Sequence, residues 1–270
     1  MHSIVLPGTD ISVTRLAFGT ASLHHLWSSR ARQNLLAAVV DMGIAHFDTS
    51  PYYGFGLAER AIGRFLRSGK PSVTVATKFG LYPPMWNSGS TTGVWARKFA
   101  GRVFPALSRP VVDWSVERAT KSLERSLRLM CVDRVDFLLL HEPQAGLFST
   151  EEILTWLSRT QGQGKIGTWG LAGELDNMRD LVAAGHPLAA VLQVRDSLGK
   201  READLLARYG RPLQFSYGYL GSAGNSLPVR EVLRAALKRN VAGSIIVSSR
   251  NQQRLAELVS VAEEECRLGA

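Results

Sequence analysis

Four side chains that can hold or transfer a proton occur in three short segments of this sequence. Asp48 and Tyr53 lie in HFDTSPYYGFGLAE, Lys78 in VATKFG and His141 in LLLHEP. An ammonium group within hydrogen-bond reach of a phenol favours the phenolate, which makes the phenol a stronger acid. If the four side chains meet, the tyrosine could donate a proton to a bound substrate near neutral pH.

Three of the four residues close apolar segments of strand length, at Ala45–Asp48, Val73–Lys78 and Val135–His141. In a (β/α)₈ barrel the C-terminal ends of all strands converge on one mouth, where catalytic groups lie. A lysine at the end of a buried strand is costly to desolvate without a carboxylate, so we expect Lys78 to pair with Asp48. A purely structural ion pair would explain those two residues but leaves Tyr53 and His141 without a reason.

Strand-length apolar runs alternate with segments of helical period along the whole chain. The expected strands are Leu16–Phe18, Ala45–Asp48, Val73–Lys78, Val135–His141, Lys165–Leu171, Ala189–Val194, Leu213–Tyr217 and Gly243–Val247. The expected helices are Arg30–Met42, Ala58–Leu66, Ser115–Leu129, Thr150–Gln161, Asp176–Ala184, Lys200–Tyr209, Val229–Asn240 and Asn251–Glu265. This alternation predicts an α/β fold, a (β/α)₈ TIM barrel that forms a single domain over residues 1–270.

Turn and cap residues refine this prediction. Ser3–Leu6 and Ile11–Val13 flank Pro7-Gly8-Thr9-Asp10, which predicts an N-terminal β-hairpin that could cap the bottom of the barrel. Gly43 stands where a helix C-terminal cap belongs, and Ser115 and Asp176 stand where N-caps belong. The long irregular segment Leu81–Val112 is of the length that usually serves a function or lacks order.

Composition narrows the class of protein. The 270 residues carry a formal net charge of +9. Basic and acidic residues are interspersed between Arg97 and Arg134. This mixture favours a solvated surface, or a funnel for an anionic ligand, over a nucleic-acid interface. The sequence contains no run of about 18 apolar residues and no charged, apolar leader. Cys131 and Cys266 lack metal-site or disulfide spacing. We expect a cytoplasmic protein, a monomer or weak homo-oligomer, without a metal, nucleic acid or membrane partner.

The segments HFDTSPYYGFGLAERAIG, VATKFG, LLLHEP and SIIVSSRNQQRLAEL occur in an order that resembles the aldo-keto reductase family over nearly the whole chain. The resemblance implies a barrel enzyme that uses NADPH to reduce the carbonyl group of a small molecule. It implies that Tyr53 protonates the carbonyl oxygen, Lys78 tunes the phenol, Asp48 holds the lysine and His141 orients the carbonyl. The nicotinamide would supply the hydride.

The same resemblance implies a set of cofactor contacts. Gln193 would hydrogen-bond the carboxamide, and Phe215 would stack on the nicotinamide. The start of the last helix would attract an anion through its free N–H groups. There, Arg254 matches the family's arginine for the adenosine 2′-phosphate, which favours NADPH over NADH, although NADH stays open. The full expected set is Gly19, Thr20, Asp48, Gln193, Phe215, Ser216, Ser248, Ser249, Arg250 and Arg254.

Two departures from the family pattern bear on the cofactor. After the fifth expected strand the family usually has Ser-Asn, whereas this chain has Ala172 and Gly173, and Ser248 replaces a common lysine. The first departure implies weaker or differently posed nicotinamide binding, and the second lowers the preference for NADPH. The substrate pocket could be walled by aromatic and imidazole side chains, although simple packing would explain them equally well. The candidates are His25, Trp27, Tyr52 and Trp86.

Three functions stay open from the sequence. The first is an oxidoreductase that acts on an aldehyde, ketone or sugar carbonyl. The second is a cofactor-binding regulatory or low-activity barrel protein, which the missing Ser-Asn pair favours and the complete tetrad opposes. The third is a cofactor-free hydrolase that uses paired carboxylates. Glu142, Glu174 and Asp196 are available for it, but it leaves Lys78 and Tyr53 unexplained.

Overall fold

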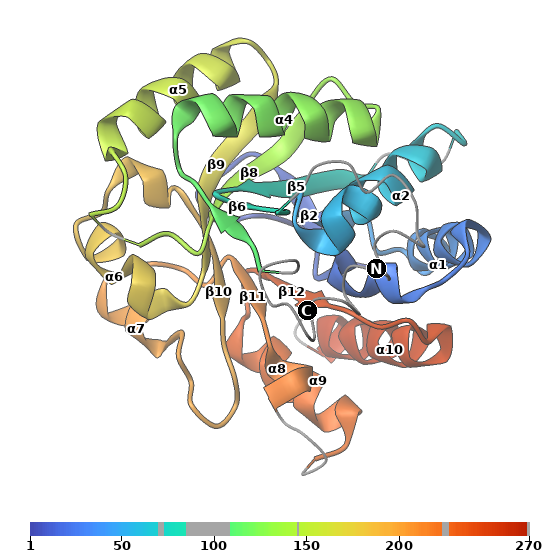
Figure 1. Cartoon of the computed structure of the whole chain (residues 1–270). Coiled ribbons are helices and arrows are strands. Elements are labelled where there is room, and N and C mark those ends of the chain that lie inside the picture. Colours follow the sequence, from blue (N-terminus) through green and yellow to red (C-terminus); the bar gives the residue numbers. More distant parts are fainter. Residues whose placement is uncertain (70–72, 85–108, 145, 223–226, 269–270) are drawn as a thin grey trace.

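The computed structural model describes residues 1–69, 73–84, 109–144, 146–222 and 227–268, and its centre is a closed barrel of parallel strands (Figure 1). The order around the barrel is β3-β4-β5-β8-β9-β10-β11-β12, with β12 pairing back to β3. The predicted barrel is confirmed. The bounds are β3 Leu16–Gly19, β4 His46–Asp48, β5 Thr74–Phe79, β8 Val135–His141, β9 Ile166–Gly173, β10 Val191–Arg195, β11 Phe215–Tyr217 and β12 Ser244–Val247.

Helices follow the strands and surround the barrel (Figure 1). The α-helices are α1 Ser29–Asp41, α2 Leu57–Leu66, α4 Val116–Met130, α5 Thr150–Gly162, α6 Leu175–Ala183, α7 Asp204–Arg208, α8 Tyr219–Ser222, α9 Val229–Arg239 and α10 Gln252–Leu268. Short 3₁₀ segments are η1 Thr20–His25, η2 Tyr53–Gly56 and η4 Pro187–Ala189.

The cap predictions have mixed outcomes. Ser115 is the N-cap of α4 and its side chain accepts a hydrogen bond from the backbone of Arg118, as predicted. Gly43 follows the C-cap of α1 with a φ of 86°. The prediction for Asp176 is wrong because the N-cap of α6 is Glu174, and Asp176 lies inside the first turn. The predicted helix Lys200–Tyr209 is shorter, since only Asp204–Arg208 is α-helical.

The predicted N-terminal hairpin is present as β1 Ser3–Val5 paired with β2 Ser12–Thr14. Its buried side chains Leu6 and Val13 pack in one cluster with Phe137 and Phe215 from the barrel interior. Burial of these apolar side chains removes them from water and closes this end of the barrel. The opposite end, where the strands finish, is left for the site.

The long segment between β5 and α4 begins and ends in a short antiparallel pair. β6 Leu81–Tyr82 pairs with β7 Val111–Val112. Trp86, an expected substrate-wall residue, lies outside the described residues.

The described part of the chain contains no helix with the length and apolar character needed to cross a bilayer. Within those same ranges, no group of three or more His, Cys, Asp or Glu residues could hold a metal ion. Cys131 and Cys266 are both free thiols.

Close packing between α2 and α4 depends on Gly63. A Cβ atom at Gly63 would lie 2.0 Å from the carbonyl oxygen of Leu129 and 2.7 Å from the Cα atom of Met130. We therefore expect Gly63→Ala to lower the free energy of unfolding by about 1–3 kcal/mol, because two backbones must separate to admit a methyl group. Urea-induced unfolding monitored by circular dichroism measures the change.

The matched control is Gly162→Ala in α5, where a new Cβ atom would meet no atom within 4 Å. That substitution should leave stability unchanged or raise it by up to about 1 kcal/mol, because alanine restricts the unfolded chain. Equal effects of the two substitutions would contradict the close helix contact.

Candidate active site

The ends of β4 and β5 bring the predicted acid and base together. Lys78 Nζ donates hydrogen bonds to Asp48 Oδ1 at 2.5 Å and to the carbonyl oxygen of Thr49 at 2.9 Å. Both side chains are buried, so the ammonium and the carboxylate depend on each other for compensation of their lost hydration. The expected ion pair is therefore present at the mouth of the barrel.

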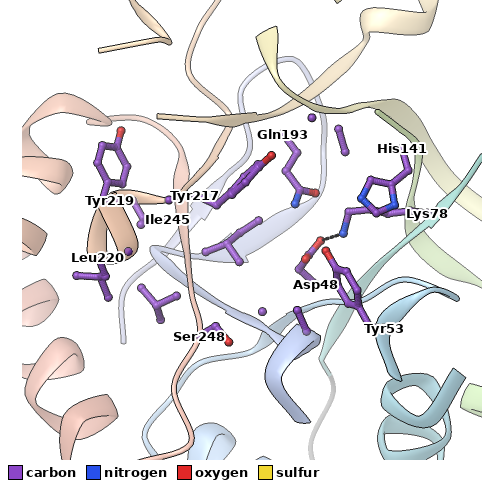
Figure 2. Close-up of a pocket in the computed structure, with 18 of the residues that line it drawn as sticks. Asp48, Tyr53, Lys78, His141, Gln193, Tyr217, Tyr219, Leu220, Ile245 and Ser248 are labelled. Atoms are coloured by element: carbon purple, nitrogen blue, oxygen red, sulfur yellow. Dashed lines mark hydrogen bonds and ion pairs between the residues drawn. The ribbon is translucent and has the colours of Figure 1, made fainter. Parts of the chain in front are cut away.

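Tyr53 enters from η2, directly after β4. The ring of Tyr53 lies beside the lysine, with Lys78 Nζ 5.0 Å from the ring centroid. His141, at the end of β8, presents its ring to Tyr53 edge-on, with centroids 6.2 Å apart and planes at 87°. Figure 2 shows the phenol oxygen on the side of the ring that faces Asp48 and Lys78. The fold thus gathers all four side chains predicted to form the tetrad.

The electrostatics of the phenol differ from the sequence expectation. Burial raises the pKa of Tyr53 well above its usual value, and the negative charges of Asp48 and Glu142 raise it further. This result corrects the prediction that Lys78 makes the phenol of Tyr53 more acidic. The main physical reason is burial of the phenol, and the ammonium of Lys78 does not offset it because it is already paired with Asp48 while a second carboxylate, Glu142, faces the same space. Tyr53 consequently keeps its proton across the physiological range.

His141 is a neutral imidazole. Burial and the nearby charge of Lys78 lower its pKa to about 3. Its Nδ1 atom lies 3.5 Å from the hydroxyl oxygen of Ser50. A neutral imidazole carries one N–H donor, which can hydrogen-bond a carbonyl oxygen without adding charge.

A cavity of about 490 Å³ opens at these strand ends, a volume within the range of small-molecule sites. Seven of the residues expected from the sequence line it, namely Gly19, Asp48, Tyr53, Lys78, His141, Gln193 and Ser248. Further lining residues were not expected as cofactor or substrate contacts, and they include Glu142, Tyr217, Tyr219, Leu220, Ile245 and Val247. Of these, Figure 2 labels Tyr217, Tyr219, Leu220 and Ile245.

Gln193, near the end of β10, has a half-satisfied amide. Its NH₂ group hydrogen-bonds the carboxylate of Asp48, where it helps to hold the negative charge. Its Oε1 atom is buried and finds no hydrogen-bond partner among the described residues. A buried acceptor without a donor costs free energy unless a ligand supplies the donor. A primary amide such as the carboxamide of nicotinamide supplies such a donor, so the site fits this group.

The stacking role expected of Phe215 does not agree with its position in the fold. Phe215 begins β11 and packs against His46, with ring centroids 5.0 Å apart, in the cluster that the hairpin covers. Ser216 is fully buried and accepts a hydrogen bond from Asn240, so it does not line the cavity either. Tyr217, two residues after Phe215, is the aromatic side chain of β11 that lines the cavity. Side chains two residues apart point to the same face of a strand, so alternation alone does not separate the two residues. Tyr217 lies at the C-terminal end of β11, where the cavity opens.

The expected phosphate-binding residues lie around the start of α10. The side chain of Asn251 accepts a hydrogen bond from the backbone of Arg254 at 3.1 Å, and Ser249 Oγ accepts one from the backbone of Asn251. Ser248 is exposed and shares a hydrogen bond of 2.9 Å with Ser22. Arg250 and Arg254 are exposed near the same helix end. Thr20 is buried and donates to the carbonyl oxygen of Asp48, a contact that holds β4 rather than a ligand.

The expected substrate-wall residues do not line the cavity in the described structure. His25 is exposed, and Trp27 is 62% exposed. Tyr52 is half-buried and packs near Phe55, with centroids 6.0 Å apart. Packing and solvent exposure account for these residues where the structure describes them.

The carboxylates considered for a hydrolase are not a pair across the cavity. Glu142 lines it, but Glu174 lies outside and forms an ion pair with Arg195 at 3.1 Å. Asp196 is buried and bonded to Arg239 and the hydroxyl of Tyr219. The geometry that hydrolysis by two carboxylates requires is therefore not formed by these three residues.

Comparisons with known proteins agree with this architecture. The model of the aldo/keto reductase family matches residues 15–209, and the chain belongs to this family. It is 28% identical to L-galactose dehydrogenase of Arabidopsis thaliana over 62% of this chain and 47% of that protein. It is 26% identical to pyridoxal 4-dehydrogenase of Microbacterium luteolum over 87% of this chain and 66% of that protein. The chain thus spans about half to two thirds of these curated relatives.

Solved structures share the fold at low sequence identity. Glycerol dehydrogenase from Gluconobacter oxydans superposes with a TM-score of 0.71 at 19% identity, covering 99% of this chain and 94% of that one. An aldo-keto reductase from Klebsiella pneumoniae in complex with NADPH superposes with a TM-score of 0.68 at 18% identity, covering 98% and 93%.

Proposed function

We propose that this protein is an NADPH-dependent oxidoreductase that reduces the carbonyl group of an aldehyde, ketone or sugar to an alcohol. The observation that carries the proposal is the position of Tyr53. Its protonated phenol faces the buried Asp48–Lys78 pair and the neutral His141 in a cavity of about 490 Å³.

Each member of the tetrad has a role that follows from its surroundings. His141 donates its imidazole N–H to the carbonyl oxygen and thereby positions it. Tyr53 gives its proton to the same oxygen as negative charge develops there. Lys78, held by Asp48, places a positive charge beside the phenolate that remains. The bound nicotinamide supplies the hydride that reduces the carbonyl carbon.

Cofactor binding is assigned to three parts of the cavity rim. Gln193 Oε1 accepts a hydrogen bond from the carboxamide, which satisfies its otherwise unpaired oxygen. Tyr217 replaces Phe215 as the candidate for stacking on the nicotinamide ring. The start of α10 and the segment before it, with Ser248, Ser249 and the two arginines, offer the positive end of the helix and positive side-chain charge to phosphates. Arg254 favours the 2′-phosphate of NADPH, with NADH as the weaker cofactor.

The substrate class is a small carbonyl compound. Among the relatives, a methylglyoxal reductase of Escherichia coli is 28% identical to this chain, in an alignment that covers 73% of this chain and 60% of that protein. A cavity of about 490 Å³ that also holds a nicotinamide leaves room for a substrate of this size.

A titration combined with an activity panel tests the proposal. NADPH and NADH fluorescence are followed as the protein is added, and oxidation of the bound nucleotide is then recorded with aldehydes, 2-oxoaldehydes, ketones and aldoses. We expect binding of both nucleotides, tighter for NADPH, and turnover with at least one carbonyl class. Binding without oxidation across the panel would favour the regulatory alternative, for which the absent side chains at Ala172 and Gly173 are the supporting observation. Absence of nucleotide binding would overturn both the oxidoreductase proposal and the regulatory alternative.

A further inference from the structure

Glu142, the residue after the tetrad histidine, has an unusual and well-anchored conformation. Its φ of 47° lies in the left-handed region, which is uncommon for a residue with a long side chain. Its backbone N–H donates to the carbonyl oxygen of Ala172 at 2.7 Å. Its carboxylate oxygen Oε2 accepts a hydrogen bond from the backbone N–H of Glu174 at 3.1 Å, and the side chain of Asn177 donates to the same carboxylate. The start of α6 therefore fixes this carboxylate in place.

The carboxylate of Glu142 fills the space beside Gly173. A Cβ atom at Gly173 would lie 2.4 Å from Glu142 Oε2 and 2.7 Å from its Cδ atom. Any side chain at position 173 would collide with the glutamate in this conformation. The glycine at the end of β9 and the glutamate at the end of β8 are therefore coupled, and a carboxylate occupies the cavity wall at this point.

The charged side chains of the cavity do not cancel. Among the lining residues that the structure describes, Lys78 carries one positive charge, and Asp48 and Glu142 carry two negative charges when both are ionised. Lys78 is bonded to Asp48, whereas the described residues offer Glu142 no ion pair. The negative charge of Glu142 contributes to the raised pKa of both Tyr53 and Tyr217, so its field reaches the two phenols that flank the reaction space.

We propose that Glu142 is the counter-charge for the oxidised nicotinamide ring, so that the cavity binds NADP⁺ more tightly relative to NADPH than it would without this carboxylate. The inference rests on the proposed function. The reduced ring is neutral and the oxidised ring carries a positive charge, so a fixed carboxylate in the same cavity stabilises only the oxidised form. Transfer of a hydride to a carbonyl whose oxygen contacts Tyr53 would require the ring to enter the cavity that Glu142 lines.

The consequence for the reaction is electrostatic. Reduction of the substrate leaves a positive ring and a negative phenolate in the cavity. The ammonium of Lys78 stabilises the phenolate. The carboxylate of Glu142 destabilises the phenolate but stabilises the positively charged ring. A carboxylate that is already oriented by α6 needs no rearrangement as this charge appears.

The test is the ratio of dissociation constants for NADP⁺ and NADPH, measured by calorimetry on the whole protein. For Glu142→Gln we expect the ratio of the NADP⁺ constant to the NADPH constant to rise about tenfold, the size of effect given by a partly screened charge pair. The matched control is Glu174→Gln, which removes a carboxylate outside the cavity and keeps the backbone donor. Its ratio should stay within about twofold of the wild-type value, the margin expected for an exposed charge.

A second pair of variants separates charge from backbone conformation. Asp and Asn both tolerate a positive φ, so Glu142→Asp and Glu142→Asn differ mainly in charge. The ratio should be higher for the asparagine variant than for the aspartate variant. Retained binding with an unchanged ratio in all Glu142 variants would overturn the counter-charge role and leave the proposed function intact. Absence of binding of either nucleotide to the wild-type protein would overturn the proposed function, and this inference with it.

Discussion

Tyr53→Phe should lower kcat by about 10²–10⁴-fold, the contribution typical of a positioned general acid. The substitution removes only the hydroxyl oxygen, and the ring can still pack beside Lys78 and His141. The dissociation constant for NADPH should therefore stay within about twofold, since the transition-state interaction is lost and ground-state binding is kept. Steady-state kinetics with the best carbonyl substrate and a fluorescence titration measure the two quantities.

A suitable control for this experiment is Tyr209→Phe, at the C-terminal end of α7 and absent from the cavity lining. It should change neither quantity. Full turnover by the Tyr53 variant would remove the phenol from the mechanism. Loss of nucleotide binding in that variant would instead mean that the hydroxyl holds the cavity together.

Lys78→Met should have the largest effect on stability. The substitution leaves Asp48 buried without its ammonium partner, which typically costs about 3–5 kcal/mol of unfolding free energy. Turnover should fall as well, because the phenolate of Tyr53 loses the nearby positive charge. Urea-induced unfolding and steady-state kinetics measure the two losses. Lys121→Met, which breaks an exposed pair with Glu117 on α4, should cost less than about 1 kcal/mol.

The pH dependence of the Lys78→Met variant follows from Asp48. Burial raises the pKa of Asp48, whereas Lys78 and the hydrogen bond from Gln193 lower it, so removal of the lysine leaves burial opposed by Gln193 alone and raises this pKa further. A carboxyl whose folded pKa lies above its unfolded pKa binds more protons in the folded state, so stability decreases as pH rises between the two values. The variant should be closer to the wild type at pH 5 than at pH 8. A stability deficit that is independent of pH would contradict an unpaired Asp48 as its cause.

The barrel could be predicted from the sequence because its pattern is local and repeated. The strand Val135–His141 was predicted with its observed bounds, since an apolar run there ends at polar residues. Helix ends were predicted less well. At α6 the N-cap lies two residues earlier than expected, at Glu174 rather than at Asp176.

The positions of the aromatic residues on β11 could not be derived in the same way. Phe215 and Tyr217 both point into the barrel. Whether such a side chain packs in the core or lines the cavity depends on its height along the barrel axis. That level is set by pairing with β10 and β12, where Gln193 lies opposite Phe215 and Arg195 opposite Tyr217. Register between strands is a tertiary property, so the family resemblance could not show that Phe215 lies in the core while Tyr217 lines the cavity.

The sequence by itself determined that Asp48, Lys78 and His141 lie near the C-terminal ends of successive barrel strands, because the alternation of apolar runs and helical segments is a local property of the sequence. Only the tertiary structure decided the charge balance around Tyr53. Glu142 reaches the cavity because Gly173, on the next strand, leaves it room, and α6 supplies its donors. Electrostatic fields depend on distances between residues far apart in the chain, which no local pattern encodes.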